Sequence, residues 1–401
     1  MSTREAAGRD GAPRCVVAGG SLVGLSVAIA LSESGVSVTV LERSPSRAES
    51  GGGGLGVDVA LLRRVTGIDD EPPVVHGTDR DTTAWHLLQG WLEDHALRRG
   101  GITVHRAAVV TSVRPGDDEQ PALVMTEDGG EYLADLVIGA DGARSTVRAS
   151  VAPDEPDARY AGVLLWRTLV DERALPDGAT RLADGEPSRE IYAGPYRLVT
   201  YLVPGAAGET SVGNRRLNLV WYDPQQDNLL RGMGLLDGET IHGSLAPGDL
   251  PDPVRERLAA FAAANWPSPW REALAQALAG GTVFGTPIVH YKPRRLTRGR
   301  TALAGDAAHA ASPMVGGGFR EGLYDVAALG QLMAEAGAEA NAGAGAGAEA
   351  GAGAGAGVSA TAIPTLLDRY QELRLRPAAR HVAVSVRATE GYLARAAGGG
   401  Q

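Results

Sequence analysis

The most informative absences in this sequence concern cysteine and long apolar stretches. Cys15 is the only cysteine among 401 residues, which excludes an internal disulfide framework and favours a reducing compartment. One cysteine and scattered histidines also give no zinc-ligand spacing. No run of eighteen apolar residues occurs, so no membrane span is expected. Residues 1–13 lack the apolar core of a secretory signal, and we therefore expect a cytoplasmic protein without a metal.

Positive charge is also scarce. The formal net charge is -10 and the pI is about 5.4, and no basic stripe suggests nucleic acid or an anionic membrane as a partner. No Gly-x-Ser-x-Gly elbow supports a serine hydrolase. The length accommodates one large domain or two ordinary ones. A monomer and a homodimer both remain open.

What the sequence does contain is glycine placed after apolar runs. The run Arg14–Ala18 predicts a buried parallel strand, and the turn Gly19–Gly24 follows it. Helical spacing over Leu25–Ser34 and a second strand over Val36–Leu41 complete a βαβ unit, which ends at Glu42. These features together indicate a site for a dinucleotide.

The turn departs from the usual dinucleotide fingerprint at one position, because Ser21 stands where the middle glycine belongs. A small side chain there still lets the backbone approach a pyrophosphate, and Gly20 adds freedom. Glu42 comes 23 positions after Gly19, close to the spacing expected for a carboxylate on a ribose hydroxyl. An ordinary glycine-rich turn between strand and helix is the alternative.

Two later stretches repeat the same arrangement. The apolar run Leu136–Ile138 leads into Gly139–Gly142, which contains Asp141. The run Thr301–Ala304 ends at Gly305-Asp306, and Gly316–Gly318 then leads into a helix near Phe319. A strand that ends in a carboxylate, followed by a glycine-lined helix start, can hold a polar ligand through free amides. Three such sites are a much stronger signal than one.

The middle of the chain has a different texture. Residues 160–281 contain short runs rich in Val, Leu, Tyr and Trp between Pro/Gly turns, which is typical of an antiparallel sheet. We therefore predict an α/β (α+β) fold. Its Rossmann-like βαβ domain comprises 12–159 and 282–398, and a smaller, mainly antiparallel β-sheet substrate domain comprises 160–281. The Gly/Ala-rich stretch 337–357 has almost no bulky apolar residue, which predicts a flexible insert.

Two shorter stretches add further expectations. The spacing of apolar residues over Thr82–Leu97 predicts an amphipathic helix. The glycine-rich stretch Ser50–Gly56 is expected to form a loop, either against a cofactor or as a tolerated surface insertion.

Taken together, the three turns resemble those of the group A flavoprotein monooxygenases, the para-hydroxybenzoate hydroxylase-like family. The resemblance covers nearly the whole chain and rests on Gly19–Gly24 with Glu42-Arg43, on GADGARSTVR over Gly139–Arg148, and on Gly305–His309 with Pro313 and Gly316–Gly318. Within the family, Trp166-Arg167, Tyr201–Gly205 and Arg215–Tyr222 look more like the dihydroxypyridine hydroxylase branch.

The resemblance implies tightly but non-covalently bound FAD, with NADH or NADPH as co-substrate. Glu42 is then expected at the adenosine ribose, Asp306 at the ribityl chain, and the amides after Met314 at the pyrimidine edge of the flavin. Gln89 stands where many members have an arginine, and Arg144 and Arg148 become candidates for the nicotinamide nucleotide. The residues implied in cofactor binding are Gly19, Gly20, Ser21, Leu22, Glu42, Arg43, Gln89, Asp141, Asp306, Val315, Gly316, Gly317 and Gly318.

The implied activity is hydroxylation of an aromatic or heteroaromatic small molecule with NAD(P)H and O2, through a flavin C4a-hydroperoxide. No residue is identified as certainly catalytic, and the candidates are His290, Arg167 and Tyr201. His309 is interpreted as a hydrogen-bonding residue of the cofactor wall rather than a base. Epoxidation, Baeyer–Villiger insertion, another oxidation of a natural product, and a non-enzymatic flavin-binding role remain as alternatives.

Overall fold

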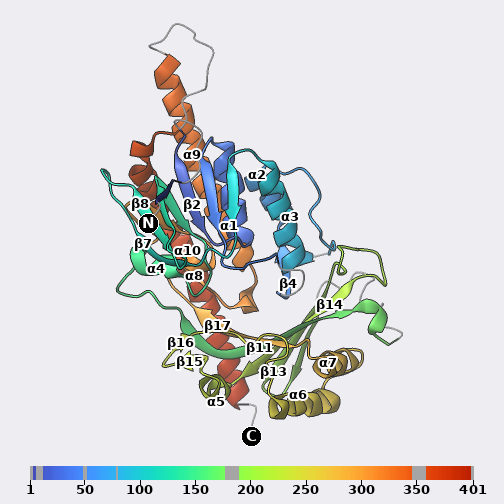
Figure 1. The fold of residues 1–401 in the computed structure, drawn as a ribbon. Helices are drawn as coiled ribbons and strands as arrows, with labels where there is room; N and C mark the ends of the chain where they lie inside the picture. The colour runs from blue at the N-terminus through green and yellow to red at the C-terminus, as the bar shows by residue number, and fades with distance from the viewer. Residues whose placement is uncertain are drawn as a thin grey trace.

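Two β-sheet lobes lie one above the other, and the long helix at the C-terminus runs along both of them (Figure 1). The computed structural model describes residues 3–5, 12–47, 52–77, 80–176, 189–345 and 358–398. The upper lobe contains a mostly parallel sheet with helices, and the lower lobe contains an antiparallel sheet. This is the predicted α/β (α+β) fold with a Rossmann-like domain and a smaller β-sheet domain.

The upper lobe is built on a six-stranded sheet with the order β18-β19-β10-β2-β3-β6. All of its strands pair in parallel except β18. The bounds are β2 (Arg14–Ala18), β3 (Ser37–Leu41), β6 (Ile102–His105), β10 (Leu136–Gly139), β18 (Thr297–Arg298) and β19 (Thr301–Leu303). The strands β2, β10 and β19 therefore lie side by side, and each leads into one of the three predicted turns.

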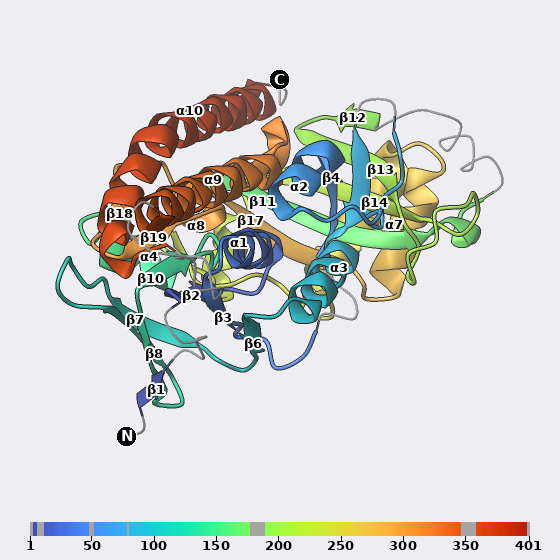
Figure 2. The same cartoon turned by 90° about the horizontal axis from the view of Figure 1, so that it is seen from above.

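Helices and smaller sheets cover this central sheet. Helix α1 (Leu22–Glu33) completes the predicted βαβ unit, and α9 (Gly318–Gly345) packs against α1. Helices α9 and α10 (Ile363–Gly398) lie side by side in the view from above (Figure 2). The other helices are α2 (Val59–Thr66), α3 (Trp85–Arg98), α4 (Thr146–Val151) and α8 (Asp306–His309). The smaller sheets are β1 (Thr3–Glu5), β9 (Glu131–Ala134), β8 (Ala122–Thr126) and β7 (Val110–Arg114), and the pair β4 (Gly54–Val57) and β5 (Asp81–Ala84).

The lower lobe is an antiparallel sheet with helices on its outer face. Its strands are β12 (Arg189–Ala193), β13 (Tyr196–Val203), β14 (Arg216–Pro224), β11 (Arg159–Asp171), β16 (Thr240–Ile241) and β15 (Leu236–Asp237), with β17 (Phe284–His290) also paired to β11. Helices α5 (Asp227–Gly232), α6 (Asp252–Asn265) and α7 (Trp270–Ala279) lie below it. Leu164 and Trp166 pack in the core that contains α6 and α7, whereas Leu165 belongs to a separate cluster. This alternation leaves one face of the sheet directed at the upper lobe.

The structure revises three details of the sequence interpretation. Strand β17 pairs with β11, so the antiparallel sheet extends past the predicted domain boundary at residue 281. Residues 337–345 continue helix α9 instead of beginning a flexible insert, because alanine favours a helix that is already propagating; the rest of that stretch, 346–357, lies outside the described residues. The predicted helix over Thr82–Leu97 begins at Trp85, since Asp81–Ala84 pairs with β4. Within the described ranges, no helix combines the length and apolarity needed to cross a bilayer.

Candidate functional site

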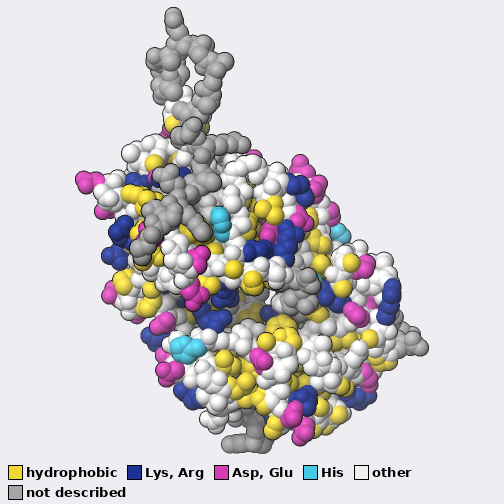
Figure 3. All heavy atoms as spheres, viewed as in Figure 1, with side chains coloured by type: hydrophobic (Ala, Val, Ile, Leu, Met, Phe, Trp, Pro, Cys, Tyr) yellow, Lys and Arg dark blue, Asp and Glu magenta, His cyan; other side chains and the backbone are white. Residues whose placement is uncertain are grey.

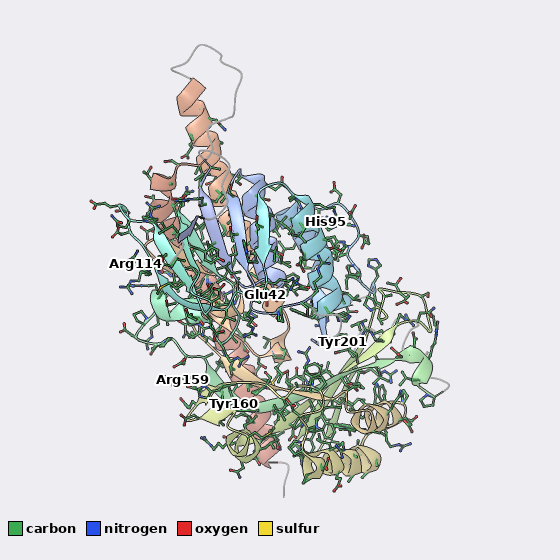
Figure 4. All side chains as sticks on the ribbon, in the orientation of Figure 1. Glu42, His95, Arg114, Arg159, Tyr160 and Tyr201 are labelled. Atoms are coloured by element: carbon green, nitrogen blue, oxygen red, sulfur yellow. The ribbon has the colours of Figure 1, made fainter. Side chains whose placement is uncertain are left out.

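A single cavity of about 1600 Å³ lies between the two lobes, and all three glycine-rich turns line it. Basic side chains gather around the hollow between the lobes in the space-filling view (Figure 3), and those that line the cavity are arginines. Glu42 on the upper lobe and Tyr201 on the lower lobe lie on opposite sides of this space (Figure 4). The turns that are far apart in the sequence therefore converge, as the sequence interpretation required.

The first turn is shaped by close backbone contacts. A Cβ on Gly24 would lie 1.9 Å from the Gly19 carbonyl oxygen, and one on Gly19 would lie 2.4 Å from the carbonyl oxygen of Ala140. Gly19 also has a positive φ of 105°, which favours glycine. The Glu42 carboxylate accepts hydrogen bonds from the amides of Gly20 at 2.7 Å and Ser44 at 2.8 Å. Glu42 is thereby fixed beside the turn at the cavity wall.

The second turn holds its carboxylate by capping a helix. Asp141 accepts from the Ser145 hydroxyl at 2.5 Å and from the amides of Thr146 and Val147 at the start of α4. Burial raises the pKa of Asp141, and these hydrogen bonds oppose that rise. Asp141 lines the cavity, but its structural task is to hold α4 in place.

Arg148, a candidate for nucleotide binding, has no donor to spare. It is 1% exposed and stacks on the Tyr291 ring at 4.0 Å. Its guanidinium donates to five backbone carbonyls, those of Gly142, Ala143, Pro156, Asp306 and Ala307. Arg148 therefore ties the second turn to the third. Arg144 does line the cavity, and it donates to the carbonyl of His242 at 2.5 Å.

The third turn presents a carboxylate without a protein partner. Asp306 opens into the cavity, and its side chain makes no hydrogen bond to any residue that the structure describes. Protein surrounds it on the other sides, and this burial raises the pKa of Asp306. A polar group that is placed inside a cavity and left unpaired is a group that a ligand can satisfy.

Behind this turn lies a fully buried charged cluster. Asp325 accepts from the amide of Gly305 at 2.9 Å, lies 2.7 Å from Nε2 of His309, and accepts from Nε of Arg374 at 2.7 Å. Burial alone would raise the pKa of Asp325, but His309 and Arg374 outweigh it and lower that pKa. Burial alone would lower the pKa of His309, but the charge of Asp325 outweighs burial, so the pKa of His309 is raised. His309 does not line the cavity; it holds the turn through Asp325.

The loop between Pro313 and helix α9 closes the same end of the cavity. Gly316 and Gly317 have positive φ values of 63° and 82°, so their amides take directions that other residues rarely allow. Val315–Gly318 all line the cavity. The first amides of α9, a helix of 28 residues, add the positive end of its dipole.

The lower wall is made of side chains from alternate positions of the antiparallel sheet. Arg167, Tyr201 and Tyr222 line the cavity, as do Arg197 and Glu190, which form an ion pair at 2.6 Å. Burial raises the pKa of Tyr201, so its hydroxyl stays protonated at neutral pH. The sequence interpretation missed Arg197, although its spacing of four from Tyr201 in a strand places both side chains on one face.

The sequence predicts a loop over the glycine-rich stretch Ser50–Gly56, but from Gly54 onward it forms strand β4, and its glycines make a contact between the lobes. A Cβ on Gly53 would lie 2.3 Å from the Arg167 guanidinium, and one on Gly54 would lie 2.7 Å from the Tyr201 ring. Arg167 donates to the carbonyl of Gly54 at 3.0 Å, and the Gly54 amide donates to Asn218 at 2.7 Å. The absence of side chains at Gly53 and Gly54 thus lets the antiparallel sheet of the lower lobe pack closely against β4. Positions 50 and 51 lie outside the described residues.

Two predicted site residues are not among those that line the cavity. Gln89 is buried on α3 and donates to the carbonyl of Gly20 at 3.1 Å, so it supports the first turn from behind. His290 lies 3.2 Å from the Ser385 hydroxyl, and burial lowers its pKa. The other predicted cofactor residues, together with Arg167 and Tyr201, all line the cavity.

Two protein-family models together match residues 77–345 of the chain. One described as an FAD binding domain matches residues 77–173 and 253–345, and one described as FAD binding domain-like matches residues 160–279. The 3-amino-4-hydroxybenzoate 2-monooxygenase of Streptomyces cremeus is 29% identical over an alignment that covers 81% of this chain and 80% of that protein. The 2,6-dihydroxypyridine 3-monooxygenase of Paenarthrobacter nicotinovorans is 25% identical over 80% of this chain and 83% of its own length.

The chain belongs to the FAD-dependent monooxygenases. The aurachin C monooxygenase/isomerase of Stigmatella aurantiaca is a further relative, 26% identical over 93% of this chain and 88% of its own length. The fold of this monooxygenase is also that of 2,6-dihydroxypyridine-3-hydroxylase from Arthrobacter nicotinovorans, with a TM-score of 0.72, 21% identity and coverage of 94% and 93% of the two chains. The residues present fit FAD, because the cavity combines a glycine cradle, the unpaired carboxylate of Asp306 and the glycine-lined loop before α9.

Proposed function

We propose that this monooxygenase hydroxylates an aromatic or heteroaromatic small molecule, using NADH or NADPH and O2. The observation that carries the proposal is the convergence of three glycine-rich turns and one face of the antiparallel sheet on a single cavity. Its volume of about 1600 Å³ exceeds the usual range for one small ligand, roughly 300–1,000 Å³. The cavity therefore has room for FAD and a second molecule together.

In this proposal the upper wall holds FAD. Glu42 accepts from the adenosine ribose, with Arg43 near the adenine, and the backbone at Ser21 and Leu22 faces the pyrophosphate. Asp306 binds the ribityl chain, because its carboxylate lies in the cavity without a protein partner. Gly19 and Gly20 let the backbone approach. Asp141 lies at the wall as the cap of α4, and Gln89 supports the turn from behind.

The loop Val315–Gly318 faces the pyrimidine edge of the flavin in this arrangement. When bound, FAD supplies the redox and oxygen-transfer chemistry. The chain contributes amides at the start of α9, where the helix dipole favours negative charge. The two lobes also exclude water from the space between them.

The lower wall orients the substrate. Leu165, Val199 and Val220 give an apolar surface for a flat ring, and Tyr201 and Arg167 supply a hydroxyl and a guanidinium at its edge. Their role is to position and hydrogen-bond the substrate. The three relatives are named for different substrates, so the residues of the present wall, rather than the family, decide the substrate.

We also propose a cytoplasmic location and a monomer or homodimer as the assembly. The single cysteine, Cys15, is fully buried, and burial raises the pKa of its thiol well above the usual range. A thiol in that state is inert packing and fits a reducing compartment. Cell fractionation and the mass of the purified protein in solution test these two points.

The deciding experiment is a screen of purified protein with phenols, hydroxypyridines and larger aromatic compounds. We expect a yellow protein whose NAD(P)H consumption one compound class stimulates, with a product heavier by one oxygen and an unchanged ring. A product with ring expansion would replace hydroxylation by Baeyer–Villiger insertion. A colourless protein that takes up no FAD would contradict the proposal altogether.

A further inference from the structure

A second cavity of about 540 Å³ lies on the far side of the loop before α9. Val315, Gly316 and Arg320 line both cavities. The rest of the second wall comes from the start of α9 and the middle of α10. Its further lining residues are Glu321, Arg376, Pro377, Arg380, His381 and Val384. The two cavities are thus separated only by this loop and the Arg320 side chain.

Three arginines surround this space without a partner. Arg320, Arg376 and Arg380 form no ion pair or hydrogen bond with any residue that the structure describes. The nearby acid, Glu321, already pairs with Arg374 at 3.1 Å. Arg376 and Arg380 are four residues apart on one helix, so their charges repel each other. In a chain whose net charge is -10, such a cluster is stabilised when an anion binds.

The remaining wall shows what kind of anion fits. Val384 is 42% exposed, and Pro377 and Val315 add further apolar surface. Nε2 of His381 is buried and lacks a hydrogen-bond partner among the described residues. A bare inorganic anion would use the arginines alone. A nucleotide would use the arginines for its phosphates and the apolar surface for its base or ribose.

We propose that this second cavity binds the phosphate-bearing part of NADH or NADPH. The inference rests on the proposed use of a nicotinamide co-substrate. A dinucleotide held here has its other end next to the shared wall, beside the cavity that the flavin occupies. Arg320 lies at that wall, since its guanidinium is 3.2 Å from where a Cβ of Gly317 would be.

This placement differs from the arginines that the family resemblance suggested. Arg148 is consumed by backbone carbonyls. Arg144 donates to His242 and lies close enough to Arg43 for that charge to lower its pKa, although burial lowers it more. Both Arg43 and Arg144 line the first cavity, where FAD is proposed to bind. The arginines of the second cavity, by contrast, have no other task.

The test compares FAD-loaded wild type with the double variant Arg376→Glu/Arg380→Glu. Anaerobic bleaching of the flavin at increasing NADH or NADPH gives the Kd and the limiting rate of reduction. Calorimetry with ADP-ribose and 2'-phospho-ADP-ribose measures binding without any reaction. We expect both measurements to show at least about a tenfold weaker Kd, because two attractive charges become repulsive, with the limiting rate changed less than about twofold.

Three further variants make the result specific. Arg387→Glu makes the same charge change on the exposed face of α10 away from both cavities and should leave the Kd unchanged. Arg376→Lys/Arg380→Lys keeps the charges and should restore most of the binding. Arg144→Glu tests the competing site. FAD content and circular dichroism should match wild type in the variants of Arg376, Arg380 and Arg387.

Two outcomes would overturn the inference alone. One is an unchanged Kd in the double variant, with or without a weaker Kd in Arg144→Glu. The other is that inorganic pyrophosphate binds the wild type at these arginines and NAD(P)H binds the double variant as it binds the wild type. The cavity would then be a site for a bare anion and not for the co-substrate. If neither NADH nor NADPH reduces the wild-type flavin, the proposed function fails as well, and that result is visible before any variant is made.

Discussion

The upper wall of the cavity is mostly backbone, whereas the lower wall is mostly side chains. Gly19, Gly20 and Gly316–Gly318 shape the upper wall through amides and through space that a Cβ would fill. Arg167, Tyr201 and Tyr222 shape the lower wall from alternate positions of three strands. A wall of backbone can hold only a ligand of fixed shape, such as a cofactor. A wall of side chains can be altered one residue at a time, which suits a variable substrate.

The largest effect in this comparison is expected from Gly24→Ala. A Cβ there would lie 1.9 Å from the Gly19 carbonyl oxygen, so α1 must move away from the turn. We expect loss of bound FAD and a lower melting temperature, measured by flavin absorbance and thermal unfolding. Gly90→Ala is the matched control, because nothing lies within 4 Å of its new Cβ inside α3. Normal FAD content in Gly24→Ala would contradict the backbone-built wall.

The next effect concerns the buried cluster that supports the third turn. Asp325→Asn removes a charge from between His309 and Arg374, and breaking a buried ion pair costs on the order of 3–5 kcal/mol. Chemical denaturation at pH 7 measures the loss. Glu335→Gln on the same helix removes only the acid of an exposed pair with Arg369 and should change little.

The pH dependence of this cluster follows from its two shifted pKa values. The pKa of Asp325 is lowered in the folded state, so its stabilisation is present above the unfolded pKa of about 3.9 and is lost as pH falls through the lowered value. The pKa of His309 is raised, so its contribution is present below about 6.5 and is lost as pH rises through the raised value. The difference between wild type and Asp325→Asn should therefore shrink at both ends. A difference that does not vary with pH would remove the charged pair from the explanation.

Variants of two acids of the upper wall should affect different quantities, FAD affinity in one case and the stability of the FAD-free protein in the other. Asp306→Ala removes a carboxylate with no described protein partner, so we expect FAD to bind roughly tenfold or more weakly, for a lost charged hydrogen bond of about 1.5–3 kcal/mol. The melting temperature without FAD should stay close to wild type. Asp141→Ala instead uncaps α4 and should lower that melting temperature first. Equal effects of both variants on apo stability would contradict this division.

The same contrast explains what the sequence could predict. The turns at Gly19, Asp141 and Asp306 follow buried strands, and a parallel sheet brings the carboxyl ends of neighbouring strands together. The βαβ unit and the shared cavity could therefore be predicted from strand order and glycine placement. Cavity-facing side chains of the antiparallel sheet depend on register, which a one-residue shift reverses. Arg197 follows only once Tyr201 is placed in the cavity, because the two residues are four apart in one strand and share a face.

Other errors arise where residues distant in the sequence decide the outcome. Arg148 has the charge that a nucleotide requires, but only the fold shows that five backbone carbonyls accept its hydrogen bonds. The glycines of Ser50–Gly56 could contact a cofactor or form a surface loop. The structure shows a different role, because Gly53 and Gly54 leave room for the side chains of Arg167 and Tyr201 from the other lobe. Helix α9 continues to Gly345 because its first turns are packed against the fold. Once a helix is nucleated in this way, residues with low helix propensity can extend it. In each case a long-range contact supplies what the local pattern lacks.

The smallest effect is expected from the side-chain wall. Tyr201→Phe removes one hydroxyl that burial keeps protonated, so the variant loses a donor to the substrate. One neutral hydrogen bond corresponds to about 0.5–1.5 kcal/mol, or a few-fold to roughly tenfold in kcat/KM, measured with the aromatic compound that best stimulates NAD(P)H consumption. FAD content should not change. Tyr192→Phe is the control, because its ring is 57% exposed and its hydroxyl meets Glu190 at the edge of the sheet. If Tyr201→Phe released FAD instead, Tyr201 would belong to the cofactor wall, and the division between the two walls would fail there.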